Sequence, residues 1–185
     1  MKFPALTLAC RKFGQSVQKD ARNNLSKKQA IASNNLSNSI TFKVIEYSGG
    51  VEVDINAEFY GAFVDQGVKG HGRGNWKPYR PKRQQAPNSP FSFKSWGPPP
   101  DVFRNWIRLK GIQPRNPKTG KFMSEKSSAF LMARSAGRFG LKPTNFMTDS
   151  LKKNLPEFRQ AIGIAIHRDV QTFMNREIFK LKKTA

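Results

Sequence analysis

Two histidines and one cysteine are the side chains of this 185-residue chain that most readily serve as catalysts or metal ligands. His71 lies in a glycine-rich basic stretch and His167 lies far along the chain beside Arg168, with no third ligand near either. A structural metal site usually takes four ligands, and nucleophilic catalysis needs a nucleophile, a base and an orienting group. With Cys10 as the single cysteine, an intramolecular disulfide and a cysteine-based zinc site are excluded. We therefore expect no catalytic residue, no metal site and no cofactor, in a protein that is not an enzyme.

The stretch Gly70–Gly74 (GHGRG) superficially resembles a loop that binds phosphate groups. A phosphate-binding loop follows a hydrophobic strand, opens a helix and ends in Gly-Lys-Ser/Thr, and this stretch has none of these features. Cys10 falls on an apolar helical stripe with no histidine near it in sequence. We expect it to be a small buried side chain rather than a reactive thiol.

Aromatic and basic side chains are interleaved in residues 67–100, a segment dense in glycine and proline. No regular element tolerates so many of these two residues, so the segment is predicted to be a long extended arm or loop. Large aromatic side chains are rare in freely disordered linkers, so we expect them to dock the arm on its own chain or on a neighbour. The predicted interface anchors are Trp76, Tyr79, Phe91, Phe93 and Trp96. The predicted charged contacts, to DNA or to acidic partners, are Arg73, Lys77, Arg80, Lys82 and Arg83.

The formal net charge of +21 is distributed unevenly. Residues 40–66 carry −4, whereas residues 67–122 carry +12. A basic segment with interleaved aromatic residues is typical of proteins that bind nucleic acid through its phosphates, without sequence preference and with a steep salt dependence. The alternative is that these cations meet acidic protein surfaces.

Length and composition indicate one core domain, since 37% of the residues are hydrophobic and fifteen are phenylalanine. No apolar run is long enough for a membrane span, and no signal peptide is evident, so no membrane partner is expected. We predict that residues 1–66 form a helix and a hairpin of this domain, that residues 67–100 form the arm, and that residues 101–185 form its helical remainder.

Apolar periodicity predicts the elements. Residues 3–25 have the three- and four-residue spacing of an amphipathic helix. The β-branched runs 40–47 and 51–55 predict an antiparallel hairpin, with Gly49 and Gly50 supplying positive φ at the turn. Further helices are expected from Asp101, as a cap, to Gly111, from Ser124, as a cap, to about residue 139, and from Asn145 onward, with Pro156 marking a kink or a fresh start.

Three segments occur in an order that resembles the tail-completion or neck proteins, which join head and tail in tailed bacteriophages. Residues 32–40 (ASNNLSNSI) resemble the family's lead into its first strand, and residues 59–67 (FYGAFVDQG) resemble the segment that follows its hairpin. Residues 130–147 (FLMARSAGRFGLKPTNFM) resemble the pattern that precedes its C-terminal helix. Val68 stands where the family usually has threonine, and the arm is longer and more basic than the pattern.

The resemblance implies an α+β protomer, in which a small antiparallel sheet is packed by an N-terminal helix and by C-terminal helices. It also implies a closed ring of about six or twelve copies in the virion neck, assembled in the host cytoplasm. The implied partners are the portal-side connector, the tail terminator or tail tube protein, and the genomic DNA that passes through the ring on ejection. Two alternatives stay open: a nonspecific nucleic-acid-binding protein, and a tail terminator that caps the tail tube.

Overall fold

The computed structural model describes residues 3–28, 34–71, 84–94, 97–116 and 118–184. The fold is α+β, as predicted, with an antiparallel two-stranded sheet and helices packed on it. The chain divides into two compact units. The first consists of Met1–Ser26, Leu36–Glu58 and Phe146–Ala185, and the second of Lys27–Asn35 and Phe59–Asn145.

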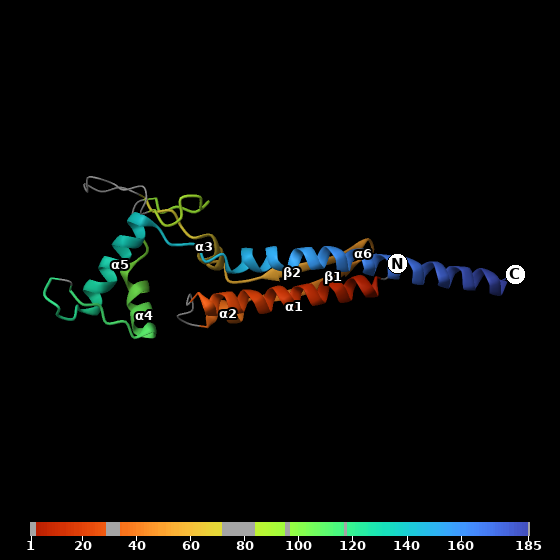
Figure 1. The fold of residues 1–185 in the computed structure, drawn as a ribbon, viewed down its shortest axis with the longest axis horizontal. Coiled ribbons are helices and arrows are strands. Elements are labelled where there is room, and N and C mark those ends of the chain that lie inside the picture. The colour runs from red at the N-terminus through yellow and green to blue at the C-terminus, as the bar shows by residue number, and fades with distance from the viewer. Residues whose placement is uncertain (1–2, 29–33, 72–83, 95–96, 117, 185) are drawn as a thin grey trace. The chain divides into compact units, whose positions relative to one another are not determined.

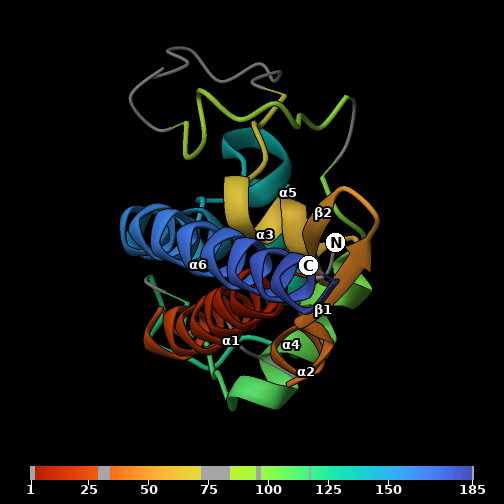
Figure 2. The same cartoon turned by 90° about the vertical axis from the view of Figure 1, so that its right-hand side faces the viewer.

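The first unit is built on two long helices that lie side by side, α1 (Pro4–Lys27) and α6 (Phe146–Thr184), coloured red and blue in Figures 1 and 2. The buried residues of α1 recur at three- and four-residue steps, the spacing that puts them on one face of a helix. Cys10, Val17, Ala21 and Leu25 are the apolar members of this face. The predicted N-terminal helix and the buried state of Cys10 are therefore confirmed.

The hairpin consists of β1 (Thr41–Tyr47) and β2 (Gly50–Asn56), and it is preceded by the short helix α2 (Asn35–Ser39). Phe42 pairs with Ile55 and Val44 with Val53, so apolar side chains share one face of the ribbon. The turn is Ser48-Gly49, since Gly50 is already paired with Tyr47. Neither glycine has positive φ, so that part of the turn prediction is wrong.

The hairpin packs on α1 at Gly14, where the helix carries no side chain. A Cβ atom built on Gly14 would lie 2.4 Å from Cδ2 of Phe42. The side chains of Gln18 and Arg22 donate hydrogen bonds of 2.7 and 3.0 Å to the carbonyl oxygen of Ile40. These contacts place the apolar face of the sheet against the helix.

Helix α6 continues through Pro156 without interruption, so the predicted fresh start at this residue is not seen. A proline inside a helix removes the hydrogen bond to the carbonyl group four residues earlier. That carbonyl belongs to Lys152, an exposed residue, where water can replace the missing donor. The predicted helical period of the C-terminal region is otherwise confirmed.

The second unit contains α3 (Gly61–Gln66), α4 (Pro100–Lys110) and α5 (Glu125–Phe139). Gly111 ends α4 with a φ of 61°, and the Ser124 hydroxyl caps α5 by accepting a hydrogen bond from the amide of Ser127, as predicted. Asp101 is not the cap of α4. The helix begins one residue earlier, at Pro100, whose fixed φ suits a first turn, and Asp101 lies inside that turn.

Candidate interaction surface

The predicted arm is closed at its base within the second unit. The amide of Gly70 donates a hydrogen bond of 2.8 Å to Oε1 of Gln84, and Nε2 of Gln84 donates one of 3.1 Å to the carbonyl oxygen of Gly70. This reciprocal pair holds together the residues on either side of segment 72–83. That segment, which carries most of the predicted contact residues, lies outside the described residues.

The closed base is also attached to the C-terminal end of α5. The amide of His71 donates to the carbonyl oxygen of Gly137, and the amide of Gln85 donates to that of Phe139, over 2.9 and 2.7 Å. The backbones approach so closely that a Cβ atom on Gly70 would lie 2.2 Å from the carbonyl oxygen of Arg138. Glycine at position 70 is therefore a packing requirement, which explains part of the GHGRG stretch without a phosphate ligand.

Phe91 is packed inside the second unit. Its ring lies 4.6 Å from the ring of Phe63 in an edge-to-face arrangement, and Phe63 contacts Phe59 in the same way over 5.4 Å. The backbone of Lys69 exchanges hydrogen bonds with Phe91 and Phe93, over 2.8 and 2.9 Å. These contacts attach the returning part of the arm to its own chain.

The other predicted anchors and charged contacts fall outside the described part of the chain. They are Trp76, Tyr79, Trp96, Arg73, Lys77, Arg80, Lys82 and Arg83. Their roles stay predictions, as does any contact of Phe91 or Phe93 with another molecule.

Two of the segments that resemble neck proteins meet in this unit, although about eighty residues separate them. The carbonyl oxygen of Val64 accepts hydrogen bonds from the amide and the hydroxyl of Thr144, over 3.0 and 2.7 Å. The amide of Asn145 donates to the carbonyl oxygen of Asp65 over 2.8 Å. Val68 and Leu141 pair as an antiparallel bridge. The two segments are therefore interlocked through their backbones, and Val68, which departs from the family's pattern, takes part in the same pairing.

The charged residues of the second unit are mostly cationic. By sequence, this unit holds nineteen lysines and arginines but three acidic residues, Asp65, Asp101 and Glu125. Asp65 is buried, and Asp101 forms an ion pair of 3.3 Å with Arg104. Described cations that lie exposed on this unit include Lys94, Arg115, Lys118, Lys121, Lys126, Arg134 and Lys142.

Glu125 is the carboxylate that links the two larger helices of the second unit. It accepts hydrogen bonds from Arg108, over 2.9 Å, and from Arg104, over 3.1 Å. The hydrogen bond from Arg108, followed by that from Arg104, holds the pKa of Glu125 below its ordinary value. The carboxylate therefore stays charged and neutralises part of the positive field of α4.

The acidic residues of the hairpin belong to the first unit and lie mostly in the solvent-facing phase of the strands. Glu46 and Glu52 are exposed, and Asp54 pairs across the strands with Lys43. One oxygen of Asp54 accepts a hydrogen bond of 2.8 Å from the amide group of Asn56. The carboxylates are spread along the ribbon rather than gathered, so their geometry indicates a charged surface and not an acid–base pair.

The described residues include no cluster of three or more histidine, cysteine, aspartate or glutamate side chains arranged to hold a metal ion. Burial raises the pKa of the Cys10 thiol, which disfavours the thiolate form. His167 is exposed on α6. Among the described helices, none is both long and apolar enough to cross a membrane.

Comparison of this chain with protein-family models, with curated proteins and with solved structures finds no match.

Two residues that organise these units were not singled out from the sequence. Gln84 closes the base of the arm, and Asp169 joins α6 to the start of α1. The sequence does contain an indication for Asp169. It follows Ala165 by four residues and Ala161 by eight, so helical spacing places this acidic residue on the same, buried side of the helix. The role of Gln84 could not be predicted in this way, since glutamine is a common residue in polar loops.

Proposed function

We propose that this chain is a structural protein of the neck of a tailed bacteriophage, where copies form a ring that joins the DNA-filled head to the tail. The observation that carries the proposal is the pairing of residues 64–68 with residues 141–145. The two segments lie far apart in the sequence and form one backbone-paired structure, as parts of a single fold pattern should.

The division of charge supports the same role. The hairpin and the second unit carry opposite charge, so neighbouring copies can attract one another through different surfaces. Contacts of this heterologous kind generate rings when the rotation between copies closes. A cationic surface also suits a passage for DNA, provided that it holds the phosphates weakly enough for the genome to move.

The test is deletion of the gene from the phage or prophage that encodes it, followed by negative-stain microscopy of the lysate. The proposal predicts filled heads and separate tails of normal length. Tails of uncontrolled length would instead assign the chain as a tail terminator, and joined, normal particles would contradict both roles.

A second candidate function, nonspecific binding of nucleic acid, is favoured by one observation. The three acidic residues of the second unit are buried or paired with arginine, so its exposed charge is positive. This function predicts that the logarithm of the affinity for a mixed-sequence DNA duplex falls linearly with the logarithm of the salt concentration. Fluorescence anisotropy measures this slope, and no binding at low salt would eliminate the candidate.

A further inference from the structure

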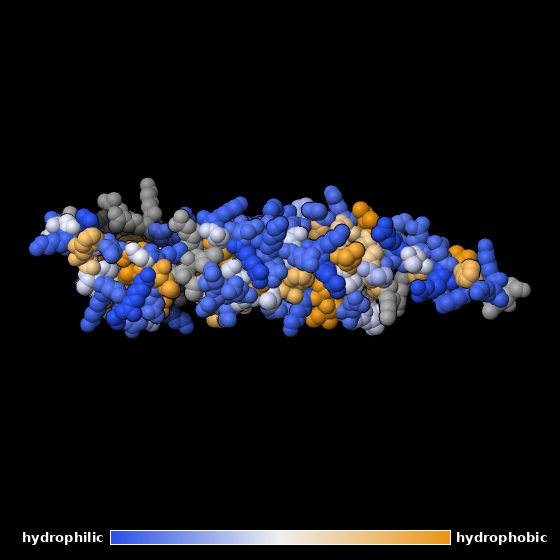
Figure 3. Space-filling view, turned by 90° about the horizontal axis from the view of Figure 1, so that it is seen from below, coloured by the Kyte–Doolittle hydropathy of each residue, from blue (hydrophilic) through white to orange (hydrophobic). Residues whose placement is uncertain are grey.

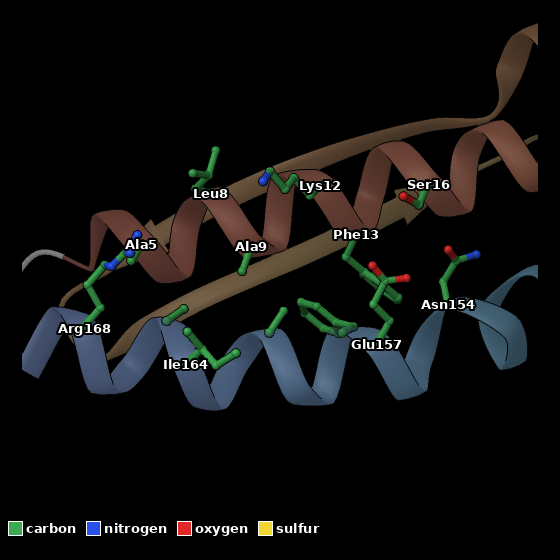
Figure 4. Close-up of a pocket in the computed structure, with 13 residues that line it drawn as sticks. Ala5, Leu8, Ala9, Lys12, Phe13, Ser16, Asn154, Glu157, Ile164 and Arg168 are labelled. Atoms are coloured by element: carbon green, nitrogen blue, oxygen red, sulfur yellow. The ribbon is translucent and has the colours of Figure 1, made fainter.

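The first unit contains an apolar groove between α1 and α6. It has a volume of about 280 Å³, and Figure 4 shows its lining side chains rising from both helices. Phe13 and Phe158 stack at its centre with ring centroids 4.0 Å apart. Leu8 and Ile164 also line it, and they are 53% and 70% exposed. Two large aliphatic side chains are thus presented to solvent beside an aromatic floor.

The spacing of the lining residues suits a helix as the occupant. On α1 the lining residues are Ala5, Leu8, Ala9, Lys12, Phe13 and Ser16, which recur at three- and four-residue steps, and those of α6 follow the same steps. Two parallel rows of this kind form the seam into which a further helix packs. Alanines in both rows allow that helix to approach closely.

An exposed helix with an apolar stripe is present in the same unit. Beyond Asp169, which accepts hydrogen bonds of 3.0 and 2.9 Å from the amides of Ala5 and Leu6, α6 extends past the first turn of α1 (Figure 1). Every described side chain from Val170 to Lys183 is exposed except Glu177. Apolar side chains interrupt the hydrophilic surface along this projecting end, at the right of Figure 3. Val170, Phe173, Met174 and Ile178 form a stripe at helical spacing and are 42–53% exposed.

We propose that the projecting end of α6 docks in the α1–α6 groove of a second copy of this chain. The stripe is short enough to fit along the groove. It spans nine residues, or about 14 Å of helix, and the α1 side of the groove spans twelve residues, or about 18 Å. The charges permit the contact. Glu177, which pairs with Lys180 over 2.8 Å, lies within the stripe, and the groove that would receive it is lined by Lys12 and Arg168 beside one carboxylate, Glu157.

The position of the two surfaces on α6 decides the symmetry of the contact. At about 100° per residue, the groove side of α6 (Ala161, Ile164, Ala165 and Arg168) and the stripe point in roughly opposite directions. One partner helix therefore cannot cover both, and a reciprocal dimer is excluded. Each copy offers its stripe to one neighbour and its groove to another, which makes a head-to-tail assembly. The inference deepens the proposed ring by naming the contact between neighbours, although its evidence does not come from the family resemblance.

The experiment is sedimentation velocity of the purified full-length chain at increasing concentration, in high salt and after nuclease treatment. The unaltered chain should form species larger than the 20.9 kDa monomer. Phe173→Asp in the stripe and Ile164→Asp in the groove should each weaken association by on the order of a hundredfold, because each would bury a charge in an apolar seam. The matched control is Phe179→Asp, which alters an exposed phenylalanine on another side of the same helical segment and should associate normally. Circular dichroism checks that each variant is folded.

Mixing the two defective variants tests the head-to-tail geometry. Phe173→Asp retains its groove and Ile164→Asp retains its stripe, so the mixture should form a dimer and nothing larger. A monomeric unaltered chain at about 100 µM, or equal defects in the Phe173 and Phe179 variants, would overturn the inference. If that happened while the deletion phage still yielded unjoined heads and tails, the proposed function would stand and the inferred contact alone would fail.

Discussion

Asp169 connects the two ends of the amino-acid sequence within the first unit. It is 4% exposed, and both of its carboxylate oxygens accept hydrogen bonds from the first turn of α1. A carboxylate at this position satisfies two backbone amides that have no partner inside the helix, and it interacts favourably with the positive end of the helix dipole. Asp169 is therefore one of several contacts that dock α1 on α6, beside the stacked rings of Phe13 and Phe158.

We predict that Asp169→Ala lowers the free energy of unfolding by about 1–3 kcal/mol, because two partly buried amides lose a charged acceptor. Asp169→Asn should lose less, since its oxygen can still accept one hydrogen bond. Urea denaturation followed by circular dichroism measures both values. Equal stability of the alanine variant and the unaltered chain would show that the cap is not needed.

Asp20 makes the stability of the first unit depend on pH. A hydrogen bond from Asn154, followed by one from Lys153, lowers the pKa of Asp20 below its ordinary value of 3.8. Because the folded pKa is the lower one, the stabilisation is complete above the unfolded pKa and is lost as the pH falls through the folded value. The side chain of Asp20 is 20% exposed and that of its partner Lys153 is 71% exposed, so water screens the pair and we expect a contribution of about 1 kcal/mol or less at neutral pH.

This contribution is measured by comparing the unaltered chain with Asp20→Asn at pH 7 and at pH 3. The difference in free energy of unfolding should be largest at pH 7 and should shrink at pH 3, which lies below the ordinary pKa of 3.8, so that the carboxylate is largely protonated in the unfolded chain. Lys153→Met should reduce the same pH dependence. A difference that grew on acidification would contradict the assignment.

At the scale of elements, replacing Gly14 and replacing Gly163 by alanine should have opposite effects on the stability of the chain. Gly14 allows the ring of Phe42 to lie against α1, whereas nothing lies within 4 Å of a Cβ atom built on Gly163 in α6. We predict that Gly14→Ala destabilises the chain by about 1–3 kcal/mol through overpacking. Gly163→Ala should stabilise it by about 1 kcal/mol through helix propensity. Thermal denaturation compares the two variants, and a rise in Tm for both would show that the hairpin does not pack on Gly14.

The elements themselves could be largely predicted from local sequence patterns. The spacing of Cys10, Val17 and Ala21 and the alternation of Val51, Val53 and Ile55 reflect burial on one face, which is why they predicted α1 and β2 correctly. The cap was wrongly assigned to Asp101 because two neighbouring residues suit the start of this helix almost equally well. Pro100 and Asp101 both suit the first turn of a helix, and local sequence does not decide which residue precedes it.

The contacts between distant segments could not be predicted in the same way. Nothing in the neighbourhood of Gln84 indicates that it pairs with Gly70, and the amides of Ala5 and Leu6 are separated from Asp169 by more than 160 residues. Such contacts depend on how whole elements pack. The interlocking of residues 64–68 with 141–145 is likewise a property of the fold, although the order of the two segments in the sequence indicated that they belong to one pattern.

At the scale of the whole molecule, charge and apolar surface are partitioned between parts of the chain. The second unit holds most of the excess positive charge, and the first unit holds the acidic hairpin, the groove and the exposed stripe of α6. Surfaces that differ in this way favour contacts with different neighbours over self-complementary pairs. This is the physical basis for proposing an assembly of many copies around DNA.

The proposed joining role is tested most directly by adding the purified chain to a lysate of the deletion phage, which should contain unjoined heads and tails. Electron microscopy counts joined particles, and a plaque assay counts infectious ones. Both counts should rise with the amount of protein added, and the folded Phe173→Asp variant should restore far fewer particles. Heads and tails that stay separate at every concentration of the unaltered chain would contradict it.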